Sequence, residues 1–110
     1  MNIGLEITKN TQKYRELLGR LESGLNDTKK YNFIHLPTRS DTKKTINSLD
    51  VLVSYGIDEQ TFNMRSDSLK WIHFGTAGID HCLSDSVLSS KVIISNSIGI
   101  HAEPVAEFVI

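Results

Sequence analysis

The sequence predicts an α/β fold in which five mainly parallel strands form one sheet covered by helices. Short apolar runs alternate along the chain with segments of helical periodicity, which is typical of parallel sheets. The run Asp50–Ser54 is apolar through its centre, as are strands buried on both faces. A length of 110 residues is sufficient for one domain with one hydrophobic core.

Two strands and one helix are predicted in the N-terminal part. The strands are Ile3–Ile7 and Phe33–Leu36. Between them, five apolar residues share one helical face, namely Tyr14, Leu17, Leu18, Leu21 and Leu25. Asn10 or Thr11 can cap the start of this helix, and Gly24 can end it.

The remaining elements follow the same alternation. The predicted strands are Asp50–Ser54, Trp71–Phe74 and Lys91–Ser95. The predicted short helices lie within Ser40–Leu49 with Asp41 as N-cap, within Glu59–Met64 with Asp58 as N-cap, and near Leu83–Leu88. The helix within Ser40–Leu49 has the weakest pattern, because only two apolar positions support it.

The last segment predicts a helix that continues beyond the chain. Its apolar residues lie on one face, at Ala102, Val105, Ala106, Val109 and Ile110. Pro104 occupies a position that the first turn of a helix tolerates. No glycine, basic last turn or polar tail follows. We therefore expect Ala102–Ile110 to be the beginning of a longer helix in a longer protein.

Composition excludes several function classes. Twelve basic and thirteen acidic side chains give a net charge of −1, which argues against a nucleic-acid partner. Cys82 is the only cysteine, so no disulfide forms within the chain and a reducing compartment is expected. The N-terminus resembles no signal peptide, and no apolar run approaches the ~20 residues that span a bilayer. A cytoplasmic protein without a membrane partner is the prediction.

Two turns are candidates for ligand binding, because ligands bind beyond the carboxyl ends of parallel strands. They are Tyr55-Gly56 and Gly75–His81. Their small residues allow backbone N–H groups to approach an anion such as a carboxylate, although the residues alone favour ordinary tight turns. Asp80 can cap the helix that follows. Adjacent Asp80, His81 and Cys82 point apart, so no metal site is predicted.

His101 precedes the last helix, where it can cap the helix or project into a pocket beside the Gly75 turn. Histidine is the natural proton donor near neutral pH. The segment after the fifth strand, Ser95–Gly99, holds one glycine and no G-x-G-x-x-G fingerprint. The chain itself is therefore not expected to bind a dinucleotide.

Two motifs resemble those of the D-isomer-specific 2-hydroxyacid dehydrogenases. Leu69–His81 (LKWIHFGTAGIDH) is similar to the family segment that ends in A-G-V-D-H. Ser95–Glu107 (SNSIGIHAEPVAE) is similar to its N-x-x-G-I-H-A-x-P-I-A-E segment. Asp50–Gly56 matches the preceding strand and its ligand-facing turn. The similarity covers the second half of the chain and looks closest to hydroxypyruvate/glyoxylate reductases and phosphoglycerate dehydrogenase-like members.

The resemblance implies a flavodoxin-like, doubly wound domain that holds the substrate. Residues 1–101 would form this domain, and residues 102–110 would begin the connector helix to a separate NAD(P)-binding Rossmann domain. The parent would be a homodimer that transfers hydride between NAD or NADP and the 2-carbon of a small 2-oxo or 2-hydroxy acid. The family's catalytic Arg, Glu and His lie downstream, so the chain alone would be inactive.

The resemblance also places six residues near the substrate: Tyr55, Gly56, Thr76, Ala77, Gly78 and His101. By similarity, the backbone of Ala77-Gly78 binds the carboxylate and Tyr55-Gly56 lines the pocket. Phe74-Gly75-Thr76 departs from the small polar residues that commonly precede A-G, which leaves the identity of the acid open. Two alternatives remain: a non-catalytic binding or regulatory module that retains the fold, and a free-standing flavodoxin-like domain for a small ligand.

Overall fold

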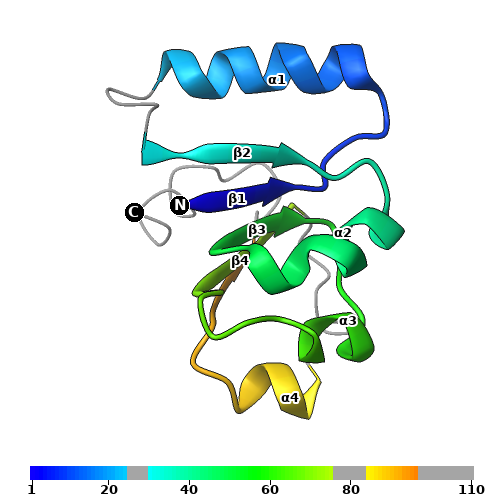
Figure 1. Ribbon diagram of the computed structural model, residues 1–110, viewed down its shortest axis with the longest axis vertical. Helices are drawn as coiled ribbons and strands as arrows, with labels where there is room; N and C mark the ends of the chain where they lie inside the picture. Colours follow the sequence, from blue (N-terminus) through cyan, green and yellow to red (C-terminus); the bar gives the residue numbers. More distant parts are fainter. Residues whose placement is uncertain (25–29, 76–83, 97–110) are drawn as a thin grey trace.

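A computed structural model describes residues 1–24, 30–75 and 84–96 of the chain (Figure 1). Its strands are β1 (Asn2–Leu5), β2 (Asn32–His35), β3 (Val51–Ser54), β4 (Trp71–Phe74) and β5 (Ile93–Asn96). They form one sheet in the order β2-β1-β3-β4-β5, and every neighbouring pair is parallel. This is the flavodoxin-like strand order, so the predicted fold class is confirmed.

Helices cover both faces of this sheet. They are α1 (Thr11–Ser23), α2 (Arg39–Thr45), the 3-10 helix η2 (Ile46–Ser48), α3 (Glu59–Asn63) and α4 (Asp85–Leu88). In β2, Ile34 packs against the main core, whereas its neighbour His35 stacks on Tyr14 of α1 with ring centroids 3.9 Å apart. Because successive strand side chains point to opposite faces, α1 lies across the sheet from the main core.

The strand register places one row of residues across the face of the sheet that carries the main core. The row consists of Ile34, Gly4, Leu52, Ile72 and Ile94. Phe62 of α3 and Val87 of α4 are buried against it at 0% and 2% exposure. A fully buried apolar side chain of this size contributes about 1.5–3 kcal/mol, so this row and the helices over it stabilise each other.

Helix caps account for where most helices begin. The Asn10 side chain accepts from the Lys13 N–H at 2.9 Å, as predicted for α1. Asp58 caps α3 through the Thr61 N–H at 2.6 Å, also as predicted. Ser84 caps α4, which begins at residue 85.

The prediction of Asp41 as the N-cap of α2 was wrong. Thr38 is the N-cap, because the backbone is extended there (φ −136°, ψ 167°) after Pro37. The Thr38 hydroxyl accepts from the Asp41 N–H, while the Asp41 carboxylate accepts from the Thr38 N–H. Asp41 is therefore the third helical residue of a capping box.

The apolar face of α1 is only partly buried. Tyr14 is buried, Leu17 and Leu18 are half-buried, and Leu21 is 42% exposed. The predicted fifth member, Leu25, and the predicted helix Ala102–Ile110 lie outside the described residues. Within the described ranges, no helix has the length and apolar character needed to cross a membrane.

Gly4 is the residue of the core row that tolerates no side chain. A β-carbon there would lie 2.7 Å from Cδ1 of both Leu36 and Leu49, which are fully buried. We predict that Gly4→Ala lowers the free energy of unfolding by about 1–3 kcal/mol through overpacking. Gly19→Ala is the control: Gly19 lies in α1 with open space around it, and alanine there stabilises by about 0.5–1 kcal/mol. Urea unfolding measures the stability of both variants. A Gly4→Ala variant that is as stable as Gly19→Ala would contradict the packing argument.

Asp58 makes stability depend on pH. The Thr61 backbone N–H donates to its carboxylate, which lowers the pKa of Asp58. A carboxyl group with a lowered pKa stabilises the fold above its unfolded-state pKa and loses this contribution as the pH falls through the folded-state pKa. Asp58→Ala should therefore cost about 0.5–2 kcal/mol at neutral pH and less in acid.

The control for this cap is Asp67→Ala, since the Asp67 side chain is exposed and makes no hydrogen bond within the described residues. Urea unfolding at neutral and acid pH would measure both variants. A cost for Asp58→Ala that does not shrink in acid would show that the charge of the cap is unimportant.

Candidate functional site

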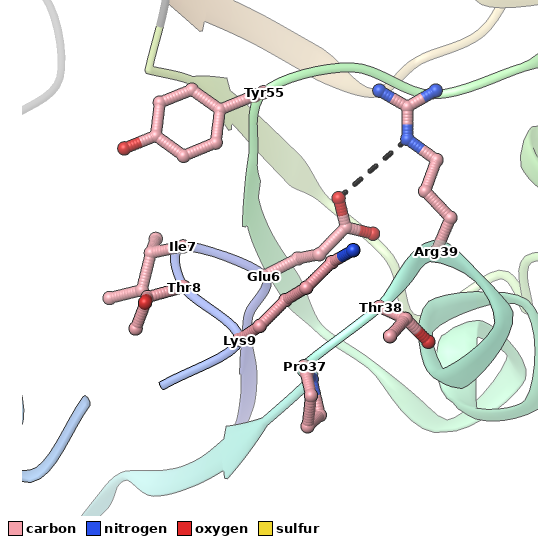
Figure 2. Close-up of a pocket in the computed structure, with 8 residues that line it drawn as sticks. All are labelled: Glu6, Ile7, Thr8, Lys9, Pro37, Thr38, Arg39 and Tyr55. Atoms are coloured by element: carbon pink, nitrogen blue, oxygen red, sulfur yellow. Dashed lines mark ion pairs between the residues drawn. The ribbon is translucent and has the colours of Figure 1, made fainter. Parts of the chain in front are cut away.

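A cavity of about 240 Å³ opens at the carboxyl ends of β1, β2 and β3 (Figure 2). Its walls are Glu6–Lys9 after β1, Pro37–Arg39 after β2, and Tyr55 after β3. The chain leaves β1 toward β2 on one side, whereas β3 lies on the other side of β1. The cavity is thus at the topological switch point, where open α/β sheets bind their ligands.

Glu6 is the most highly connected charged group of this cavity. Its side chain is 11% exposed. Oε1 accepts from the Thr42 hydroxyl of α2, and Oε2 lies 2.9 Å from the Ser54 hydroxyl of β3. The Arg39 Nε lies 3.8 Å from Oε2. These contacts compensate the loss of water around the carboxylate, which would otherwise make its burial costly.

Ser54 connects this carboxylate to the predicted ligand turn. Its hydroxyl is buried, lies 2.8 Å from the Gly56 carbonyl oxygen, and accepts from the Gly56 N–H at 3.2 Å. The single hydroxyl proton can serve either Glu6 or the Gly56 carbonyl at one time. The Gly56 N–H is therefore used within the turn. Of the predicted pair, Tyr55 lines the cavity, whereas Gly56 is buried and is not part of the lining.

Tyr55 also contacts the second predicted turn. Gly75 follows β4 directly, and its N–H donates to the Ser54 carbonyl oxygen at 2.8 Å. A β-carbon on Gly75 would lie 2.7 Å from Cε1 of Tyr55, so the absence of a side chain allows the ring to approach. The ring, 51% exposed, thus lies between the cavity and the start of the Gly75 turn. Thr76, Ala77, Gly78 and His101 lie outside the described residues.

A separate polar cluster lies on β4 and β5. Trp71 Nε1 donates to the Ser95 hydroxyl oxygen at 2.8 Å, and the same oxygen lies 2.8 Å from His73 Nδ1. Burial lowers the pKa of His73, which favours the neutral imidazole. Within the described part of the chain, no three His, Cys, Asp or Glu side chains are placed to hold a metal ion. Asp80, His81 and Cys82 lie outside that part.

Sequence reasoning missed Glu6, Lys9 and Arg39 as site residues. The predicted ligand turns, Tyr55-Gly56 and Gly75–His81, follow only the third and fourth strands, although ligands can bind beyond the carboxyl end of any strand in such a sheet. The same principle predicts Glu6–Lys9, which follow the first strand, as ligand-binding candidates. Arg39 could be predicted as a site residue only from the strand order, which no local sequence pattern specifies.

Comparisons of the chain with models of protein families, with curated proteins and with solved structures found no match.

Thr42 tests how much the buried Glu6 carboxylate depends on its donors. Thr42→Val keeps the side-chain shape and removes the hydroxyl that donates to Oε1. We predict a loss of about 1.5–3 kcal/mol in the free energy of unfolding, the range for hydrogen bonds to charged groups. Thr45→Val in the same helix is the control, because the Thr45 hydroxyl makes no hydrogen bond within the described residues. Equal losses in urea unfolding would show that Glu6 does not need this donor.

Proposed function

We propose that this chain is the substrate-binding half of an NAD(P)-dependent oxidoreductase that interconverts a small 2-oxo acid and a D-2-hydroxy acid. The observation that carries the proposal is the contact between Tyr55 and Gly75. Ser54 and Phe74 are register partners, so the two motif-bearing turns begin side by side at one edge of the sheet. This arrangement supports a shared pocket for one small ligand, as the sequence motifs imply.

In this proposal the chain binds and orients the acid. The backbone N–H groups of Ala77-Gly78 hold the carboxylate, since amides in a tight turn form anion-binding concavities. The Tyr55 ring covers one side of the acid and limits the access of water. Thr76 and His101 line the remainder. Proton exchange with the substrate is assigned to a residue outside this chain.

The described site does not fit a dinucleotide. The turn after β1 is Glu6–Lys9, which contains no glycine, and the Glu6 carboxylate lies where a pyrophosphate would need N–H donors. NAD or NADP, which would supply the hydride, is therefore assigned to another part of the parent protein. We expect no NADH binding by the 110-residue chain, and a saturable change in nicotinamide fluorescence on titration with the chain would contradict this.

Activity of the native protein that carries this sequence is the direct test. We predict oxidation of NADH or NADPH with at least one of glyoxylate, hydroxypyruvate, pyruvate and phosphohydroxypyruvate, followed by nicotinamide absorbance. Gly75→Ala should raise KM, because the added β-carbon displaces the Tyr55 ring. Gly19→Ala, far from either turn, is the matched control and should leave KM unchanged.

Absence of turnover with all four acids and both cofactors would overturn the proposal. Binding of one of these acids without turnover would instead favour a non-catalytic module that retains the fold. The parent's dimeric state is part of the same proposal and is measured by analytical ultracentrifugation of the native protein.

A further inference from the structure

We propose that the cavity at the ends of β1, β2 and β3 is a binding site for a small anion, bound through Lys9 and Arg39. The ligand class is a compact carboxylate or phosphate. This site shares the Tyr55 ring with the Tyr55–Gly75 contact on which the proposed dehydrogenase function depends, but the inference does not require that function.

The charges around the cavity carry the inference. Two cations and one carboxylate line it, namely Lys9, Arg39 and Glu6. Within the described residues, Lys9 forms neither an ion pair nor a side-chain hydrogen bond. Asp58, which is outside the cavity lining, interacts electrostatically with both Lys43 and Arg39. The cavity thus has an excess of one positive charge, which an anionic ligand would neutralise.

Glu6 acts here as a positioning residue for Arg39. Each of its carboxylate oxygens lies within hydrogen-bond distance of a protein hydroxyl, Oε1 of Thr42 and Oε2 of Ser54. Its remaining interaction is with Nε of Arg39, which leaves the terminal guanidinium N–H groups of this 57% exposed side chain available. Such groups bind carboxylates and phosphates in bidentate geometry. Figure 2 shows the Lys9 side chain directed toward the Glu6 carboxylate, whereas Arg39 faces this carboxylate with Nε and directs its two terminal nitrogens away from it.

The size and walls of the cavity define the ligand. A volume of about 240 Å³ is smaller than the ~300–1,000 Å³ typical of pockets for larger organic ligands. Ile7, Pro37 and the Tyr55 ring supply apolar walls. Apolar walls lower the local dielectric constant and strengthen the attraction between an anion and the two cations. A phosphate or a carboxylate of a few carbon atoms fits these conditions.

Nuclear magnetic resonance titrations of the 15N-labelled protein test the site directly. The probes are inorganic phosphate and acetate, each at constant ionic strength maintained with chloride. We expect saturable shifts of the Ile7, Thr8 and Thr38 amides, which belong to the cavity walls. Lys9→Gln should weaken binding about tenfold or more, since it removes one charge-assisted contact. Lys13→Gln is the matched control, because Lys13 is exposed on α1 outside the cavity lining.

Arg39→Gln provides a second variant with the same expected direction. Stronger binding of phosphate than of acetate identifies phosphate as the ligand class, and the reverse order identifies carboxylate. Shifts that chloride alone reproduces, or equal affinity in wild type and Lys9→Gln, would overturn the proposal. These measurements contain no nicotinamide and no turnover, so their failure is distinguishable from failure of the dehydrogenase function.

Discussion

The largely buried carboxylate of Glu6 is the constraint on which the geometry of the site depends. It lies one residue beyond β1 and contacts side chains from two other elements: Thr42 and Arg39 in α2, and Ser54 in β3. A carboxylate at 11% exposure without such donors would be strongly destabilising. Its position therefore fixes how α2 and β3 meet the end of β1, and this meeting point is the mouth of the cavity.

The same network extends from Glu6 to Gly75, the residue that follows β4. The Ser54 hydroxyl contacts Glu6 on one side and both backbone polar groups of Gly56 on the other. This fixes the turn that carries Tyr55, and the Tyr55 ring then packs over Gly75. Two glycines serve different purposes in this arrangement: Gly4 provides room for core leucines inside the sheet, while Gly75 provides room for a half-exposed ring at its edge.

Local patterns were sufficient to predict most of the fold. The apolar runs predicted all five strands, with Trp71–Phe74 at its observed bounds and both ends of each other strand within two residues of the observed ones. Asn10, with Thr11 as its alternative, and Asp58 were predicted as caps because the side chain of a cap accepts from the N–H group three residues later, as it does from Lys13 and Thr61. The prediction of Asp41 as an N-cap was wrong although the interaction is local. Thr38 and Asp41 cap each other reciprocally, so the sequence allows either residue to be taken for the N-cap.

The candidate site was less predictable because its contacts are distant in sequence. Glu6 is 36 residues from Thr42 and 48 residues from Ser54. Each pair is brought together only when β1 lies between β2 and β3, which no local pattern specifies. Tyr55 could be predicted as a site residue because it follows a recognisable strand directly in the sequence. Glu6, by contrast, resembles any polar residue after a strand until the strand order is known.

The two proposed sites share Tyr55 but differ in what they require. In the proposed dehydrogenase, hydride transfer needs a cofactor and a proton-exchanging residue from elsewhere, so Tyr55 and Gly75 would contribute only orientation and shielding. Anion binding needs only the excess positive charge of Lys9 and Arg39 and the walls around them, all within this chain. The Tyr55 ring forms a wall of the anion cavity and packs against Gly75 of the proposed substrate site. A ligand that moves this ring on binding to one site would therefore change the affinity of the second site for its own ligand. By linkage that change is reciprocal, so the shared ring provides a physical route for coupling between the two proposed sites.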